Sequence, residues 1–186
     1  ILLARGSTST QIFARFLWLL AVKEIVGKIV SFDMTDYVAQ TVEHYLNLSG
    51  VTGLKKAATP YCPDGTLLPQ NDEEGGELAN EASSILMKTL WVARLARPDL
   101  SRPTCKMASH VQKWSRNDDR RLRRMIEYMH ASRAFQLQGF ICDPQEVLEL
   151  WLFADADLAS DPETSKSTTG GWLVLVGPNS WVPPAW

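Results

Sequence analysis

The sequence has few of the side chains that bind transition metals or form covalent cross-links. Its 186 residues include 3 cysteines and 3 histidines. Cys62, Cys105 and Cys142 form no Cys-x-x-Cys pair, and no zinc-ligand spacing with the histidines occurs. Three isolated cysteines suit a reducing compartment better than a disulfide-stabilised secreted protein. The composition therefore predicts an intracellular protein without a zinc site.

Long hydrophobic runs are also missing. The most apolar run, residues 16–22, lies between Arg15 and Lys23 and is too short to cross a bilayer. No clear signal-peptide cleavage site follows it. Hydrophobic residues make up 45% of the chain and charged residues 22%, proportions that are ordinary for a globular protein. We therefore expect no membrane partner, and one domain or two small ones.

Positive and negative charges nearly balance over the whole chain but not within individual segments. The formal net charge is -2, which alone predicts no polyanionic partner. Residues 94–133 contain 11 basic and 4 acidic residues, whereas residues 143–163 contain 7 acidic residues and no basic one. This pairing suits a nucleic-acid track beside a metal-binding pocket. It equally suits solvated helix faces that are rich in arginine.

Helical patterns dominate the first two thirds of the chain. We expect a helix over residues 11–30, within an N-terminal segment (residues 1–34) to which no chemistry is assigned. Thr35 is a candidate cap for a helix over residues 36–48, which Gly50 ends. Residues 61–80 hold 5 acidic residues and no basic one, which predicts a surface loop or a partly disordered linker.

Three more helices are expected downstream. The first covers residues 82–96, and the second begins at Leu100 or Thr104 and ends at Trp114. Ser115 or Asn117 caps the third, with acidic residues in its favourable first turn. The third helix is predicted to turn four apolar residues to a core (Leu122, Met125, Ile126 and Met129) and four arginines to other faces, as candidate nucleic-acid-binding residues (Arg120, Arg121, Arg123 and Arg124).

Strand patterns dominate the last third. Strands are expected over residues 134–140, 148–154, 169–176 and 180–182, as an antiparallel meander that Pro183 and Pro184 end. The apolar run 148–154 is dense enough to predict a strand buried on both faces. The fold class is therefore α+β, with a helical region followed by an antiparallel meander.

Asp155 and Asp157 follow the first of the long strands. Alternation along the strand would place both acids on the face that carries Trp151 and Phe153. A carboxylate at a buried strand end needs a partner, and a divalent cation is the usual one. Acidic strand ends also form turns and helix caps, so the pair alone leaves both interpretations open.

The region around these acids resembles a known family. The runs DADLASD (155–161), SKSTTGGW (165–172) and NSW (179–181) look like the start of the ribonuclease H domain in copia-type retrotransposon polyproteins. That family writes D-A-D-W-A-G-D, then K-S-T-S-G-Y, then I-S-W. Leu158 and Ser160 depart from the pattern.

Three upstream segments extend the resemblance. Residues 84–99, with LWVAR and RPD, are similar to the family's G-S-L-M-Y-L-A-x-x-T-R-P-D-I, and RRMIEYM (123–129) resembles A-x-x-R-I-L-R-Y-L. Residues 35–60, with ATP at 58–60, resemble the region that follows the polymerase palm. The resemblance covers residues 35–181 in the family's order.

The resemblance implies the domain organisation and the chemistry. Residues 35–133 would be a thumb- or connection-like end of a reverse transcriptase, and residues 134–186 the truncated start of a ribonuclease H-like domain. Asp155 matches the catalytic, metal-binding Asp of the first strand, and Asp157 an acid common in these elements. The complete parent would use Mg²⁺ and act on RNA/DNA hybrids or DNA. The polymerase's Tyr-x-Asp-Asp turn is missing.

These expectations support three hypotheses. The first is a fragment of a retrotransposon polyprotein that binds no metal and catalyses neither parental reaction, because its partners in the polyprotein are missing. The second is a non-catalytic nucleic-acid-binding remnant that uses the arginines of helix 118–130. The third is a helical and β-meander domain with an unassigned interaction role, and it does not explain why separate segments match one family in order.

Overall fold

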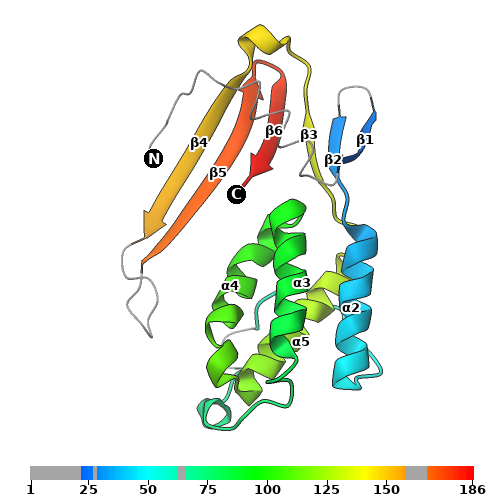
Figure 1. Ribbon diagram of the computed structural model, residues 1–186, viewed down its shortest axis with the longest axis vertical. Helices are drawn as coiled ribbons and strands as arrows, with labels where there is room; N and C mark the ends of the chain where they lie inside the picture. Colours follow the sequence, from blue (N-terminus) through cyan, green and yellow to red (C-terminus); the bar gives the residue numbers. More distant parts are fainter. Residues whose placement is uncertain (1–21, 27–28, 63–65, 158–166) are drawn as a thin grey trace. The chain divides into compact units, whose positions relative to one another are not determined.

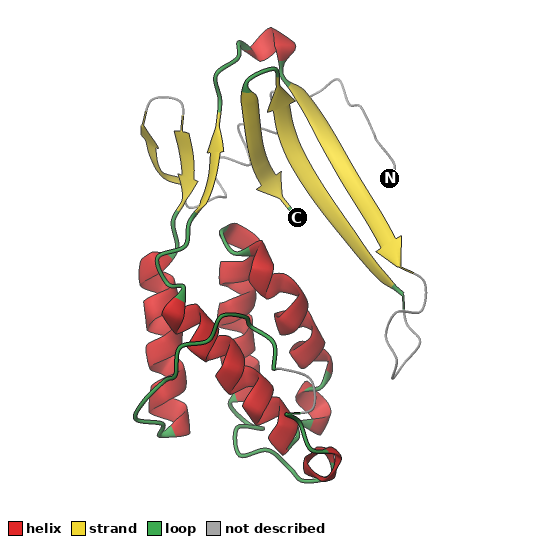
Figure 2. Cartoon of the chain, turned by 180° about the vertical axis from the view of Figure 1, so that it is seen from behind, coloured by secondary structure: helices red, strands yellow, loops and turns green. Residues whose placement is uncertain are grey.

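The chain divides into two units. A computed structural model describes residues 22–26, 29–62, 66–157 and 167–186. The helical unit is Met34–Gln136, and the sheet unit combines Ile1–Asp33 with Leu137–Trp186. Helices α2 to α5 lie in the first unit, and the paired strands β1 to β6 lie in the second (Figures 1 and 2). The fold is therefore a mixture of helices and an antiparallel sheet.

The helical unit is built around α3 and α5. Its α-helices are α2 (Thr35–Ser49), α3 (Ala82–Leu95), α4 (Ser101–Ser109) and α5 (Arg116–Ala131), with 3-10 turns η1 (Pro69–Asp72), η2 (Pro98–Leu100) and η3 (Val111–Lys113). The largest fully buried apolar side chains of α3 and α5 are Ile85, Leu86, Val92, Leu122, Met125, Ile126 and Met129. The four apolar residues predicted to face the core from α5 are confirmed.

Local signals place the helix ends. Gly50 ends α2 with a φ of 64°, a left-handed conformation that glycine adopts without steric cost, and its N–H donates to the Leu46 carbonyl. Ser115 caps α5, as one of the two predicted alternatives. Thr35 is instead the first residue of α2, and Met34 precedes it without a capping side chain.

The sheet unit contains one antiparallel sheet of six strands. They are β1 (Val22–Val26), β2 (Ile29–Phe32), β3 (Leu137–Phe140), β4 (Glu149–Asp157), β5 (Thr168–Gly177) and β6 (Ser180–Ala185), with a turn η4 (Gln145–Val147). The order is β1-β2-β3-β6-β5-β4. The predicted meander is present as β4, β5 and β6, and its long β4–β5 pair runs in register from Glu149↔Val176 to Asp157↔Thr168.

The predicted N-terminal helix is wrong for the described residues. Residues 22–26 and 29–30 lie in the paired strands β1 and β2, and residues 11–21 fall outside the description. The reason lies in the composition, because Val and Ile dominate this stretch and stiff, branched side chains favour strands. The segment therefore belongs to the sheet unit, where β2 pairs with β3.

The predicted burial of β4 on both faces is also wrong. β4 is an edge strand with β5 as its neighbour, and its described side chains from Glu149 to Ala156 are half-buried or exposed. An unbroken apolar run does not distinguish a central strand from an edge strand. Alternation along β4 is visible in its aromatic residues, because the rings of Trp151 and Phe153 lie 6.0 Å apart on one face.

The two prolines expected to end the last strand do not end it. β6 continues through Pro183 and Pro184 to Ala185, which pairs with Leu173. The register shifts between the Leu173 and Leu175 pairs, so the residues without an N–H lie where the ladder is irregular. Within the described residues, no helix is both long and apolar enough to cross a bilayer.

Candidate functional site

The acids predicted to bind metal lie at the end of β4. Asp155 is exposed and pairs through its backbone with Gly170 on β5. Asp157 is the last residue of β4 and is described in its backbone alone, so the expectation that both carboxylates share a face lies outside the description. Among residues whose positions are described, no three His, Cys, Asp or Glu side chains form a group that could hold a metal ion.

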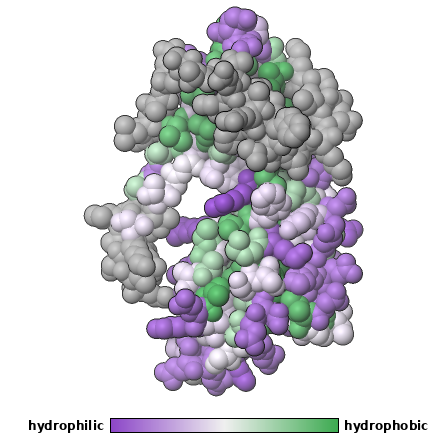
Figure 3. Space-filling view, viewed as in Figure 1, coloured by the Kyte–Doolittle hydropathy of each residue, from purple (hydrophilic) through white to green (hydrophobic). Residues whose placement is uncertain are grey.

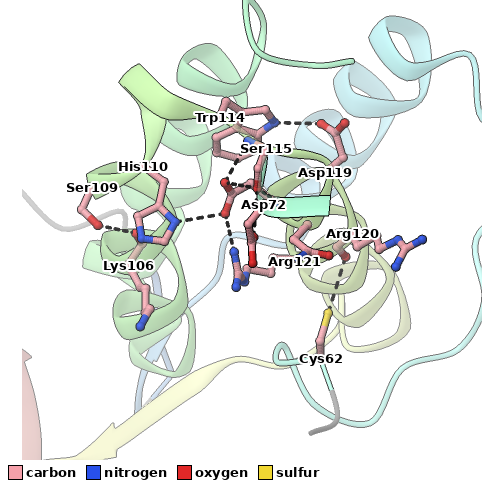
Figure 4. A network of polar contacts seen from close by, with 12 residues as sticks. Cys62, Asp72, Lys106, Ser109, His110, Trp114, Ser115, Asp119, Arg120 and Arg121 are labelled. Atoms are coloured by element: carbon pink, nitrogen blue, oxygen red, sulfur yellow. Dashed lines mark hydrogen bonds and ion pairs between the residues drawn. The ribbon is translucent and has the colours of Figure 1, made fainter. Parts of the chain in front are cut away.

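A dense polar network among the described residues lies instead at the start of α5 (Figure 4). The N–H and hydroxyl of Ser115 both donate to the Asp118 carboxylate, at 3.0 and 2.9 Å, and the Asp118 N–H donates back to the hydroxyl. This reciprocal capping box satisfies N–H groups that a helix start leaves unpaired. His110 and Arg121 also reach the Asp118 carboxylate, at 3.1 and 2.8 Å.

These contacts set the protonation of Asp118. Burial alone would raise its pKa, because a charged carboxylate loses hydration. The hydrogen bonds from the Ser115 backbone, His110, Arg121 and the Ser115 hydroxyl outweigh burial and hold the pKa below its ordinary value. Asp118 is therefore a charged structural group, and its contacts are used within the helical unit.

The acidic loop packs against the same helix start. Asp119 accepts hydrogen bonds from the backbone N–H groups of Glu77 and Leu78, at 2.6 and 3.2 Å, and from the Trp114 indole at 2.8 Å. The Gly76 N–H donates to the Trp114 carbonyl. Of the two interpretations of residues 61–80, a surface loop or a partly disordered linker, these contacts favour the surface loop for residues 74–78, because the start of α5 holds their backbone.

The four arginines of α5 that were predicted to bind nucleic acid also make contacts within the unit. Arg121 binds Asp118, and Arg123 binds Glu127 one turn further on, at 3.2 Å. Both Nη atoms of the exposed Arg120 face the side-chain amide of Asn71, whose oxygen accepts from them at 3.0 and 3.3 Å in the appropriate amide orientation.

Arg124 binds the loop that precedes the acidic segment. Its Nε donates to the carbonyls of Thr59 and Tyr61, at 3.0 and 3.2 Å, and its Nη2 donates to the Thr59 hydroxyl at 3.3 Å. Cys62, beside this loop, has a raised pKa because burial outweighs the nearby arginines. Arginine count alone therefore does not report which side chains remain available to a ligand.

A second cluster was not predicted from the sequence. Arg97 is 3% exposed and binds Asp99 at 2.7 Å, and the Tyr128 hydroxyl donates to the same carboxylate at 2.7 Å. Arg97 also donates to the Ser132 carbonyl and hydroxyl, and its guanidinium lies 5.4 and 5.5 Å from the ring centres of Tyr128 and Phe135.

The protonation of this cluster follows from its contacts. Burial would raise the pKa of Asp99, but the hydrogen bonds from Arg97 and Tyr128 and the Arg97 charge lower it overall. Burial and the Asp99 carboxylate raise the pKa of Tyr128. The sequence signal is the Arg97-Pro98-Asp99 run, which directly follows the helix predicted over residues 82–96. The structure shows that it also joins the end of α3 to the end of α5.

Comparison of the chain with protein-family models, with curated proteins and with solved structures finds no match. A functional assignment therefore rests on the residues and their geometry, together with the resemblance of separate segments to one family.

Proposed function

We propose that the chain is part of a copia-type retrotransposon polyprotein, from the end of the reverse transcriptase into the first strands of ribonuclease H. The parent would be an RNA-directed DNA polymerase that also degrades the RNA of RNA/DNA hybrids. The chain itself would carry out neither reaction. Its partners would be a hybrid or DNA and the remaining parts of the polyprotein.

The observation that carries this proposal is the position of Asp155. It lies near the exposed end of β4, the first strand of the antiparallel β4–β5–β6 meander. The family's ribonuclease H domain begins with such a meander and holds its first metal-binding Asp on the first strand. Thr168 and Thr169 of the SKSTTGGW run lie at the start of β5, and the NSW motif begins in the β5–β6 turn, so the described part of the meander and the sequence resemblance coincide.

The donor set of β4 fits Mg²⁺ only in part. Carboxylate oxygens are suitable Mg²⁺ ligands, and the exposed Asp155 carboxylate is accessible to one. Hydrolysis of a phosphodiester by two metals needs carboxylates that hold two cations about 3.5–4 Å apart. One strand does not surround two cations, so Asp155 needs acids from other segments. In the parent, the ions would activate water and stabilise the leaving oxygen.

Two experiments test the proposal. The first sequences the transcript through both ends of this reading frame. We expect the frame to continue downstream into a helix with a Glu and upstream into a Tyr-x-Asp-Asp turn. Flanking frames that encode an unrelated, complete domain would contradict a polyprotein origin, whereas stop codons close to both ends would leave a decayed remnant.

The second experiment incubates the purified chain with a labelled RNA/DNA hybrid and Mg²⁺, beside Asp155→Asn and an active ribonuclease H. We expect no cleavage above background from either form of the chain. Mg²⁺-dependent cleavage by the original chain that Asp155→Asn abolishes would show that it is an enzyme by itself.

A second candidate function is binding of nucleic acid without catalysis, favoured by the excess of basic residues between positions 94 and 133. The sequence pattern assigns this function to four arginines of α5 (Arg120, Arg121, Arg123 and Arg124). If this is correct, replacing them by Ala weakens both the binding and its salt dependence. An affinity that does not change with salt would contradict nucleic-acid binding. Because these arginines make intramolecular contacts, other basic residues of the unit are candidates for this role.

A further inference from the structure

We infer that the nucleic-acid contact surface of the helical unit is the exposed side of α4 and η3, formed by Arg102, Lys106 and Lys113, with Tyr61 at its border. We call this surface the α4 basic face. The inference rests on the proposed function, because it takes the phosphate backbone of a nucleic-acid duplex as the ligand. It moves the binding role away from the arginines of α5.

The first argument is the availability of the charges. Arg102, Lys106 and Lys113 are all exposed, and none of their side chains has a hydrogen-bond or ion-pair partner among the described residues. Arg121 and Arg124, by contrast, are half-buried and bind Asp118 and the Thr59 loop. A cation that already neutralises a carboxylate or binds a carbonyl has less to gain from a phosphate, so the α4 cations are the better candidates.

The second argument is the absence of acids on this segment. Residues 101–113 contain three Lys or Arg residues and no Asp or Glu. The other exposed residues of α4 and η3 are Cys105, Ala108, Ser109 and Gln112. Small and uncharged neighbours allow a phosphate backbone to approach without like-charge repulsion. A surface of this kind offers charge complementarity to a polyanion but little base recognition.

The third argument is the spacing of the cations. Arg102 and Lys106 are four residues apart on α4, so they lie on one side of the helix about 6 Å apart along its axis. Lys113 ends η3, which follows α4 and contacts it. Figure 1 shows α4 at one side of the helical unit, and hydrophilic residues gather along the edges of this unit in Figure 3.

Tyr61 supplies an aromatic border to the α4 basic face. Its side chain is 47% exposed, and Arg124 holds its carbonyl through a 3.2 Å hydrogen bond. Burial of its inner part raises the pKa of the Tyr61 hydroxyl, and the charge of Arg102 is close enough to lower it in part. An exposed ring beside a cation can pack against a sugar or base while the cation binds phosphate. Arg124 would thus position the border of the surface rather than contact nucleic acid.

The test measures binding to a fluorescein-labelled 20-base-pair DNA duplex by anisotropy, at salt concentrations between about 50 and 200 mM. Three neutralised phosphates correspond to a slope of log K against log salt of about -2.7, or a loss of about 40-fold in affinity across this range. In the variant Arg102→Gln/Lys106→Gln/Lys113→Gln we expect the slope to become less steep by about this amount. Tyr61→Ala should weaken binding without changing the slope, because a neutral side chain displaces no counterion.

The matched control removes the same charge elsewhere. Lys55, Lys56 and Arg133 are exposed residues of the same unit on segments other than α4 and η3, and the variant Lys55→Gln/Lys56→Gln/Arg133→Gln changes the net charge equally. We expect it to retain the original slope. The two triple variants should keep the original thermal unfolding midpoint, because their replaced side chains are exposed.

Four outcomes would overturn the inference. If the α4 variant retains the slope while the original chain binds with salt dependence, the surface is misplaced although nucleic-acid binding survives. If the salt slope of the control variant becomes less steep by the same amount, the effect is one of net charge. If the original chain binds polyglutamate with the same slope, the surface is a general polyanion site. If it binds no duplex, both the surface and the binding function fail, and the polyprotein origin is decided by the transcript.

Discussion

Ser115 and Asp118 hydrogen bond to each other in both directions, through three contacts of 2.9 to 3.3 Å at the start of α5. The same carboxylate accepts from His110 and Arg121, so one buried acid joins α5 to the residues that follow α4. Because the contacts of Asp118 hold its pKa below the ordinary value, its charge contributes to folding in a way that depends on pH.

The first prediction concerns acid sensitivity. A carboxyl group whose pKa is lowered by folding stabilises the protein above its unfolded pKa, about 3.9 for Asp, and this contribution is lost as the pH falls through the folded pKa. At neutral pH we expect Asp118→Asn to reduce the free energy of unfolding by roughly 1.5–3 kcal/mol, since charged hydrogen bonds are lost. Below about pH 3.9 the difference from the original chain should shrink.

Urea denaturation between pH 7 and pH 2.5 measures this difference. Glu81→Gln is the control, because Glu81 is exposed and its replacement should leave the profile unchanged. A stability difference between the original chain and Asp118→Asn that is constant over the whole range would show that the charge of Asp118 does not contribute.

The second prediction concerns the approach of the acidic loop to α5. A Cβ atom added at Gly76 would lie 2.5 Å from the Trp114 ring and 2.6 Å from the Ser115 carbonyl oxygen, whereas one added at Gly75 would meet nothing within 4 Å. We expect Gly76→Ala to destabilise the protein by about 1–3 kcal/mol through overpacking. Gly75→Ala should change its stability by less than about 0.5 kcal/mol.

Thermal unfolding of the two neighbouring variants provides the comparison. The two substitutions add the same methyl group in the same loop, so backbone propensity affects both similarly. Equal unfolding midpoints would indicate that the loop leaves the start of α5 in solution, contrary to the hydrogen bonds of Asp119.

Helices α2, α3 and α5 were predictable because their signals are local, whereas α4 ends at Ser109, before the predicted Trp114, and the helix predicted over residues 11–30 is wrong for its described residues. Gly50 and Ser115 mark helix ends, and the apolar residues of α5 recur at helical spacing, so these features are predictable without knowledge of tertiary contacts. The edge position of β4 was not predictable, because strand order depends on pairings between distant segments. The pairing of β2 with β3 joins residues more than one hundred positions apart.

The candidate site, too, was only partly predictable from the sequence. The resemblance selects Asp155, and the structure places it at an exposed strand end. The arginines of α5 were selected by charge, but their partners come from other segments: Arg124 reaches back to Thr59 and Tyr61. A sequence pattern shows where charge is concentrated, whereas its availability depends on tertiary contacts.

The third prediction concerns the ion pair between the buried Arg97 and the more exposed Asp99. Arg97 makes hydrogen bonds to Asp99 and Ser132, and Tyr128 supports the carboxylate. Removal of the Arg97 guanidinium leaves the Ser132 carbonyl and hydroxyl without their buried donor, whereas Asp99, whose side chain is 35% exposed, becomes hydrated, so Arg97→Ala should cost about 1–3 kcal/mol. The exposed Arg94, in the last turn of α3, is the control, and Arg94→Ala should cost less than about 0.5 kcal/mol.

Equilibrium unfolding in urea compares these two variants. Arg97→Lys adds a second test, because lysine keeps the charge but not the planar fork, and it should recover only part of the loss. If Arg97→Lys retained the full free energy of unfolding, charge alone would matter. Similar losses of stability in Arg97→Ala and Arg94→Ala would contradict the structural role of the pair.

The fourth prediction separates the positioning role of Arg124 from nucleic-acid binding. Its guanidinium holds the carbonyls of Thr59 and Tyr61, so Arg124→Gln should release this loop and speed amide hydrogen exchange around residues 59–62. The exposed Arg120 carries the same charge on the same helix but makes no hydrogen bond to this backbone, and Arg120→Gln should leave exchange there unchanged. Exchange followed by mass spectrometry measures both.

Binding to a DNA duplex then completes the comparison. If Arg124 acts by positioning Tyr61, Arg124→Gln should lower affinity to the same degree as Tyr61→Ala and leave the salt slope nearly unchanged. A direct phosphate contact would instead reduce the slope by about 0.9. For Arg124→Gln we therefore expect faster amide exchange and an unchanged salt slope. A reduced slope with unchanged exchange would instead show that Arg124 contacts nucleic acid directly.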